Sequence, residues 1–145
     1  MTATPRGAVL AIDHGERRTG LAIVDPLRIA ARALEVVDSP EDALMRRIAA
    51  LCEERVVATF LVGLPLDAQG RDGGRAASVR AFATRLAARF PAVEVVFHDE
   101  RLTSKEADLR LVEAGHAGRA RKERRDAWAA LVLLQDWLES GEPRA

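Results

Sequence analysis

Cysteine, aromatic side chains and net charge are all scarce in this chain. Its 145 residues include one cysteine, Cys52, which excludes an intrachain disulfide framework and fits a reducing cytosol. Aromatic residues make up 4%, and we interpret both tryptophans, Trp128 and Trp137, as packing or partner-facing residues of the last predicted helix rather than a base-stacking platform. Basic and acidic residues balance at 22 each. This balance argues against wrapping of long duplex nucleic acid but leaves room for a local basic patch.

Several common signatures are also missing. No apolar run approaches the length of a membrane span, and the N-terminus lacks a signal peptide, so we expect a cytoplasmic protein without a membrane partner. Neither a P-loop nor a Rossmann glycine pattern occurs. The histidines His14, His98 and His116 lack zinc-ligand spacing with one another or with Cys52. We expect His98 to have a structural or supporting role.

The apolar pattern predicts a single α/β domain over residues 1–139, followed by a disordered tail over 140–145. Strands are expected at 8–13, 20–25, 29–37, 56–62 and 93–97. Helices are expected at 39–55, 74–90, 103–115 and 121–138, the first beginning with Ser39 as N-cap and Pro40 at its first position. The short 14–19 loop favours an antiparallel hairpin, whereas helical crossovers make the last two strands parallel to the first. The result is a five-stranded mixed sheet flanked by helices, in the order βββαβαβαα.

Three carboxylates stand where a phosphate-cutting metal site would need them. Asp13 ends the first apolar strand, Glu100 follows the fifth, and Asp126 lies near the start of the last helix. Acids at the ends of buried elements are costly unless a cation satisfies them. Convergence of these acids would create a site for Mg²⁺ or Mn²⁺, with two ions activating water and stabilising the leaving oxygen. Each acid also has a simpler interpretation. Asp13 could be a turn residue, Glu100 could pair with Arg101, and Asp126 could be a first-turn acid favoured by the helix dipole.

Basic residues lie beside two of these acids. Arg17 and Arg18 follow Asp13 in the hairpin loop, where they could hold phosphates or simply be solvated. A second basic cluster directly precedes Asp126, although cations at a helix N-terminus oppose the dipole and bring no local stability. This second cluster contains Arg121, Lys122, Arg124 and Arg125. The cluster therefore favours phosphate binding over a plain solvated face. Arg75, Arg80, Arg85 and Arg89 form no single stripe on the 74–90 helix and are weak evidence.

Four segments together resemble the YqgF/RuvX family of pre-16S rRNA nucleases, also called Holliday-junction-resolvase-like proteins. They are AIDHGERRTGLA at 11–22 with Asp25 closing the second strand, VGLPL at 62–66, DERLTSKEA at 99–107, and RRDAWAALVLLQDWL at 124–138. The segments cover nearly the whole chain in the family's order, and the third is the most specific. The chain departs from the family at Asp67, often Asn there, and at the bulky Trp128.

The resemblance implies an RNase H-like fold and a Mg²⁺- or Mn²⁺-dependent nuclease acting in maturation of the 5′ end of 16S rRNA. It implies that Asp13, Glu100 and Asp126 are both metal ligands and catalytic acids. Arg17, Arg18, Arg101 and the 121–125 cluster would then position the nucleic-acid backbone. The expected partners are precursor rRNA and a ribosomal particle, with the protein a monomer or homodimer. Two alternatives remain open: a resolvase acting on DNA junctions, which should dimerise, and a catalytically silent nucleic-acid-binding module.

Overall fold

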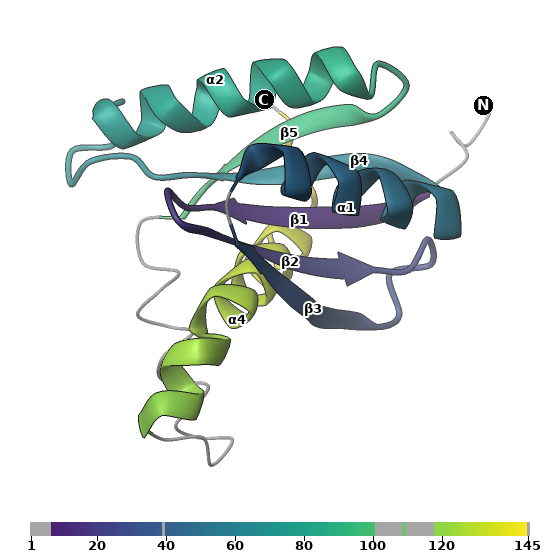
Figure 1. Cartoon of the computed structure of the whole chain (residues 1–145), viewed down its shortest axis with the longest axis horizontal. Helices are drawn as coiled ribbons and strands as arrows, with labels where there is room; N and C mark the ends of the chain where they lie inside the picture. The colour runs from purple at the N-terminus through teal and green to yellow at the C-terminus, as the bar shows by residue number, and fades with distance from the viewer. Residues whose placement is uncertain (1–6, 39, 101–108, 110–117, 145) are drawn as a thin grey trace.

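The computed structural model describes residues 7–38, 40–100, 109 and 118–144, and within 118–126 it describes the backbone alone. Five strands form one mixed sheet in the spatial order β3-β2-β1-β4-β5 (Figure 1). The strands are β1 (Ala8–His14), β2 (Arg18–Val24), β3 (Ala31–Asp38), β4 (Val57–Leu64) and β5 (Glu94–Asp99). β2 runs antiparallel to both of its neighbours, β1 and β3, whereas β4 is parallel to β1 and β5 is parallel to β4. The predicted sheet is therefore confirmed.

Helices cover both faces of this sheet. The helices are α1 (Glu41–Glu54), α2 (Gly74–Arg89) and α4 (Gly118–Glu139). In Figure 1, α1 and α2 lie on one side of the strands, and α4 crosses the other side. The helix predicted at 103–115 falls outside the described residues. Within the described part of the chain, no helix combines the length and apolar character that crossing a membrane requires.

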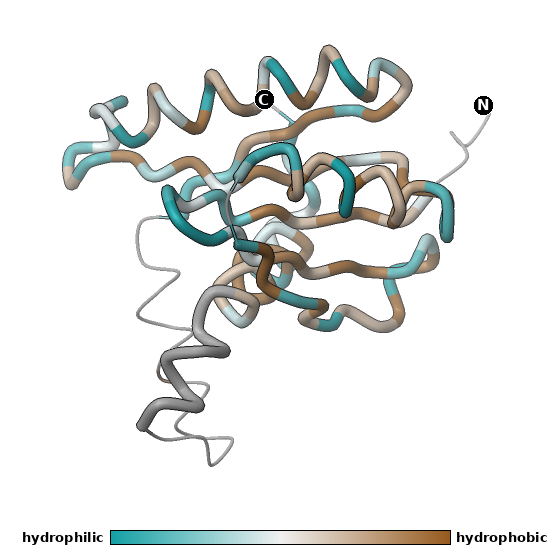
Figure 2. The backbone as a smooth tube through the Cα atoms, in the orientation of Figure 1, coloured by the Kyte–Doolittle hydropathy of each residue, from teal (hydrophilic) through white to brown (hydrophobic). Residues whose placement is uncertain are grey.

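Alternation along β1 divides the core into two layers. Ala8, Leu10 and Ile12 pack against α1 and α2, whereas Val9 and Ala11 pack against α4. A strand buried on both faces needs apolar residues throughout, which is why β1 reads as a continuous apolar run. Figure 2 shows the same hydrophobic colouring along the central strands. Since side chains alternate, the next two positions of β1 face opposite layers, position 13 toward α4 and position 14 toward α1 and α2.

The start of α1 differs from the sequence prediction. Pro40, not Ser39, is the N-cap residue, with extended backbone angles (φ −88°, ψ 171°), and no side chain caps this helix end. Ser39 lies outside the described residues. Glu41 and Asp42 occupy the first turn, where their negative charges interact favourably with the helix dipole. Helix α1 therefore begins one residue later than predicted and depends on first-turn acids rather than on a hydroxyl cap.

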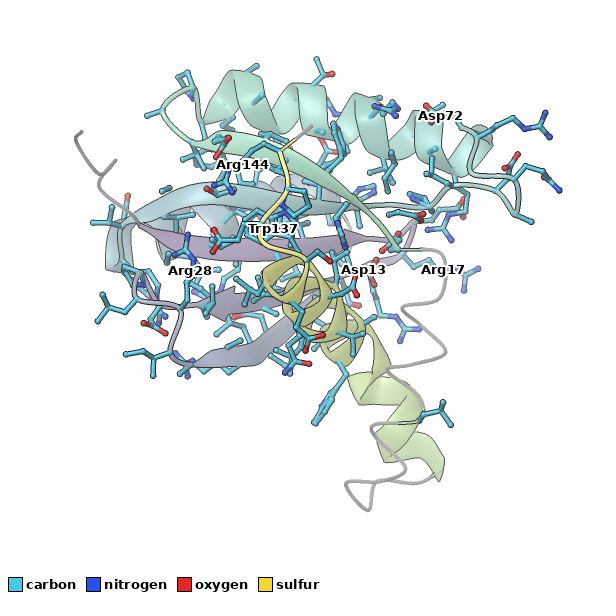
Figure 3. All side chains as sticks on the ribbon, turned by 180° about the vertical axis from the view of Figure 1, so that it is seen from behind. Asp13, Arg17, Arg28, Asp72, Trp137 and Arg144 are labelled. Carbon is cyan, nitrogen blue, oxygen red and sulfur yellow. The ribbon has the colours of Figure 1, made fainter. Side chains whose placement is uncertain are left out.

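The C-terminal segment also differs from the expected disordered tail. Trp137 is fully buried, and its indole Nε1–H donates to the Pro143 carbonyl at 2.9 Å. The Arg144 guanidinium lies 5.2 Å from the Trp137 ring centre and pairs with Glu94 of β5 at 3.3 Å. Figure 3 shows Trp137 and Arg144 side by side across this segment. A buried indole N–H needs an acceptor, and the returning chain supplies it.

Candidate active site

Asp13 and Glu100 meet at one end of the sheet, as the sequence predicts. Asp13 lies near the end of β1 opposite Gly20 of β2. Glu100 directly follows β5, and its backbone N–H donates to the Leu64 carbonyl at the end of β4 at 3.2 Å. Because β1, β4 and β5 are parallel, their carboxyl ends share one edge of the sheet. The two residues are far apart in the sequence, yet their side chains form one hydrogen-bonded pair.

Gly63 of β4 makes room for this pair. A Cβ atom at position 63 would lie 2.8 Å from the Glu100 Cδ and 3.1 Å from the Leu133 Cδ2, and closer still to Glu100 Oε2. The Glu100 carboxyl group therefore lies directly over the β4 backbone and beside α4. Carbon atoms pack at about 3.5–4.0 Å, so any side chain at position 63 would displace it. The glycine is required here by space, not by an unusual backbone angle.

The pair is electrostatically strained without a cation. Partial burial raises the pKa of the Glu100 carboxyl well above its ordinary value, and the charge of Asp13 and the hydrogen bond with Asp13 raise it further. Two carboxylates in contact cannot both stay ionised at low cost, so they must share a proton or bind a cation. Hard carboxylate oxygens suit Mg²⁺ or Mn²⁺. The donor set therefore fits the predicted metal.

Asp126 falls within α4, but its side chain is outside the described part of the structure. Among the side chains that are described, no three metal-ligating residues gather at one point. The structure thus brings together two of the three predicted acids. The convergence of all three stays a prediction.

Arg75 in the first turn of α2 acts on this site, although sequence reasoning gave it little weight. Its positive charge lowers the pKa of Glu100, opposing the effect of Asp13, and it lines a small cavity together with His14. Its neighbours on α2 are engaged elsewhere: Arg80 pairs with Asp72, and Arg85 with Glu41. The four arginines of α2 were a usable signal, but sequence spacing alone did not say which of them acts on Glu100.

The predicted phosphate-binding residues are only partly placed. Arg17 and Arg18 are exposed in the β1–β2 hairpin, which continues directly from Asp13. Figure 3 shows Asp13 and Arg17 on the same side of the molecule. The remaining predicted cations lie outside the described side chains. They are Arg101, Arg121, Lys122, Arg124 and Arg125.

Three further polar residues have structural roles. His98 Nε2 contacts Asp136 Oδ2 of α4 at 2.6 Å, which ties β5 to that helix and fits the supporting role expected for it. Asp67 closes its own loop, because its Oδ1 accepts the backbone N–H groups of Gln69 and Arg71. Asp25 likewise accepts three backbone N–H groups in the turn after β2, and these hydrogen bonds lower its pKa.

Two comparisons with known proteins agree on the family. The sequence model of the RuvX family, described as Holliday junction resolvase, matches residues 7–140. A protein of Anaeromyxobacter sp. (strain Fw109-5) is 44% identical over 131 residues, which are 90% of this chain and 95% of that protein. A protein of Rubrobacter xylanophilus is 44% identical over 138 residues, covering 94% of this chain and 96% of the relative. Both bear the name "Putative pre-16S rRNA nuclease".

Solved structures agree on the fold. T. thermophilus RuvC in complex with a Holliday junction substrate superposes with a TM-score of 0.57 at 22% identity, covering 95% of this chain and 98% of that one. A second structure of Thermus thermophilus RuvC gives a TM-score of 0.54 at 19% identity, covering 94% and 98%. RuvC has an RNase H-like fold, so the fold class predicted from the sequence is confirmed.

Proposed function

The chain belongs to the RuvX family, and from this membership we propose that it is a divalent-metal-dependent nuclease that cleaves precursor 16S rRNA. The observation that carries the proposal is the contact between Asp13 and Glu100 over Gly63. A partly buried pair of like charges is costly for folding, and it is a common feature of sites that perform chemistry. The names of the relatives supply the substrate class.

Asp13 and Glu100 would hold the metal, with Asp126 as the third carboxylate. Mg²⁺ or Mn²⁺ bound there would activate a water molecule and neutralise the charge that develops on the cleaved phosphate. Arg75 lies close enough to lower the pKa of Glu100. It would therefore help keep that carboxylate ionised and available, and its guanidinium would face the incoming phosphate backbone.

The position of Asp126 in α4 supports its inclusion. Residues 126 and 133 are separated by about two turns of the helix, so these positions share one side of α4. The Leu133 Cδ2 on that side lies near the Cβ position of Gly63, beside the Glu100 carboxyl group. The basic cluster at 121–125 would then enter the site from the same helix. Together with Arg17 and Arg18 it would hold the phosphates on either side of the cut.

A cleavage assay tests the proposal. An end-labelled RNA spanning the 5′ leader junction of 16S rRNA is incubated with Mn²⁺ and wild type, Asp13→Asn or Asp126→Asn, with EDTA as a metal-free arm. We expect each substitution to reduce the rate at least about 100-fold, the loss typical when a charge-stabilising group is removed. Asp42→Asn removes an exposed carboxylate from α1 and serves as the matched control, with wild-type rate expected.

Metal binding gives a second readout, independent of turnover. Titration calorimetry with Mn²⁺ should show binding to wild type and to Asp42→Asn, and weakened binding to Asp13→Asn and Glu100→Gln. Cleavage that survives EDTA, or that survives in both Asp13→Asn and Asp126→Asn, would refute the metal-nuclease assignment. Tight RNA binding without metal affinity would instead favour the silent binding module.

A DNA junction is the second candidate substrate. It is favoured by the family description as Holliday junction resolvase and by the likeness in fold to RuvC. The same variants are therefore assayed on a synthetic four-way junction, with the oligomeric state measured in parallel. Junction cleavage by a dimer, together with an inert RNA substrate, would replace the rRNA proposal.

A further inference from the structure

A second cavity lies at the same end of the sheet, on the opposite face from the acidic pair. Its volume is about 260 Å³. Its floor is a cross-strand row in which His14 of β1 pairs with Thr19 of β2, and Thr19 pairs with Val37 of β3. The first turns of α1, with Glu41 and Leu44, form the opposite wall. The cavity thus begins at the residue that directly follows Asp13.

Thr19 is the unusual residue on the floor of this cavity, because it is polar and buried. Its exposure is 4%, yet the side-chain hydroxyl has no hydrogen-bond partner among the residues that the structure describes. A buried hydroxyl without a partner costs about 1–3 kcal/mol, so proteins seldom retain one in a core strand without a reason. Thr19 lines a cavity that is open to an incoming ligand. A ligand in the cavity would satisfy its hydroxyl.

The acidic side chains of the wall offer hydrogen-bond acceptors. Asp38 is exposed at the end of β3 and lines the cavity with Glu41. Glu41 is held in place by Arg85, whose Nε and Nη2 donate to its two oxygens at 2.7 and 2.8 Å. An ionised carboxylate has about four acceptor sites, so two remain for a ligand. Val37 and Leu44 add apolar surface between these acceptors.

These walls match a flat ring with apolar faces and amino groups on its edge. We propose that the cavity binds one nucleobase of the substrate strand, in a nucleotide adjacent to the cleaved bond, and that it prefers guanine over uracil. Guanine presents neighbouring N–H donors that one carboxylate accepts together, as in other bidentate pairs. Uracil presents a single N–H between two carbonyl oxygens, which the carboxylates repel. The inference rests on the proposed function, because it assigns a base preference to that same nuclease.

The size of the cavity supports a single base. Pockets for drug-sized ligands typically have volumes of about 300–1,000 Å³, so a cavity of about 260 Å³ falls just below that range. A base flanking the cut could reach it, because both sites lie at the same end of the sheet and His14, which lines the cavity, directly follows Asp13. The substrate RNA strand would then cross the end of the β-sheet, with its phosphate at the acidic pair and its base in the cavity on the far face.

A binding test that needs no turnover comes first. ¹⁵N-labelled protein is titrated without metal with guanosine 5′-monophosphate and, separately, with uridine 5′-monophosphate. We expect the backbone amides of Thr19 and Val37 to shift with the guanine nucleotide at lower concentration. Thr19→Val, which keeps the shape and removes the hydroxyl, should weaken guanine binding about 3- to 10-fold, the usual effect of one lost hydrogen bond. Equal affinity for both nucleotides would overturn the proposal.

The cleavage test varies the base on each side of the cut and compares kcat/KM for guanine and uracil. Wild type should favour guanine, and the ratio should fall about 3- to 10-fold in Thr19→Val and in Asp38→Asn. Asp42→Asn, on α1 but outside the cavity, should keep the wild-type ratio. Cleavage with no base preference would refute the cavity assignment and leave the nuclease assignment standing. Guanine-selective binding with no cleavage of any RNA would refute the nuclease assignment and leave the cavity assignment standing.

Discussion

Replacing Gly63 with alanine should separate stability from catalysis. The added methyl group would lie 2.8 Å from the Glu100 Cδ and 3.1 Å from the Leu133 Cδ2. Ordinary carbon contacts are about 3.5–4.0 Å, so the Glu100 carboxyl group would have to move by roughly 1 Å. That group is the end of a flexible side chain, and Leu133 must give by only a few tenths of an ångström.

The two consequences differ in size. Because the side chain can swing away, we expect Gly63→Ala to lower the free energy of unfolding by less than about 3 kcal/mol, the upper end for modest overpacking. A misplacement of about 1 Å in a catalytic group, by contrast, can reduce the rate about 100-fold. Gly63→Ala should therefore be well folded, bind Mn²⁺ more weakly and cleave about 100-fold more slowly.

The matched control is Gly74→Ala at the start of α2. Apart from its chain neighbours and the nearby backbone of α2, no heavy atom of the described residues lies within 4 Å of its added methyl group. Alanine is a better helix former than glycine by up to about 1 kcal/mol, so this control should be equally or more stable and cleave like wild type. The measurements are urea denaturation, Mn²⁺ titration and single-turnover cleavage on the three proteins.

The background of Glu100→Ala supplies the refuting test. In that background the clash with Glu100 is gone, so adding Gly63→Ala should cost less stability than it does in wild type. Wild-type cleavage and Mn²⁺ affinity in Gly63→Ala would show that Glu100 does not act from its position over β4. An unchanged stability cost in both backgrounds would show that the methyl group never meets the carboxyl group.

Further predictions concern stability. Because the folded state raises the pKa of Glu100 above 4.5, the free energy of unfolding of the metal-free protein should fall as pH rises above that value. Glu100→Gln should flatten this dependence on pH, measured by urea denaturation at several pH values. An unchanged dependence would contradict the prediction. Thr19→Val should raise the free energy of unfolding by about 1 kcal/mol, seen as a higher Tm, since it removes a buried hydroxyl that has no partner among the described residues. A lower Tm would indicate a partner for that group. Truncation after Ser140 should cost about 1–3 kcal/mol by removing the Pro143 acceptor of Trp137, and an unchanged urea midpoint would show that the segment contributes nothing.

Local patterns were sufficient for the five strands and for the placement of two acids at strand ends. Continuous apolar runs marked β1 and β4 because both strands are buried on their two faces. Asp13 and Glu100 were identifiable because a charged residue at the end of such a run is unusual. The start of α1 was misplaced, since Ser39 and Pro40 both suit a helix start and the sequence pattern could not rank them.

The C-terminal segment shows the limit of composition. Its Gly, Pro and charged residues are typical of a disordered tail. In the structure Arg28 pairs with Glu142, and Arg144 pairs with Glu94. The first pair spans more than a hundred residues of sequence, and the second spans about fifty. Neither partner is near the tail in sequence, so only the assembled sheet could bring them together.

The sequence by itself determined the strands and the placement of Asp13 and Glu100 at strand ends, because strand periodicity and the position of an acid at a strand end are local properties. Only the tertiary structure decided that Asp13 and Glu100 touch, that Gly63 makes room for them, and that Arg75 is the arginine of α2 that acts on them. It alone revealed that the buried Thr19, whose hydroxyl has no hydrogen-bond partner in the described part of the chain, lines a cavity on the other face. The physical reason is that side-chain contacts and burial arise from parallel strands and crossing helices that meet only when the chain is folded.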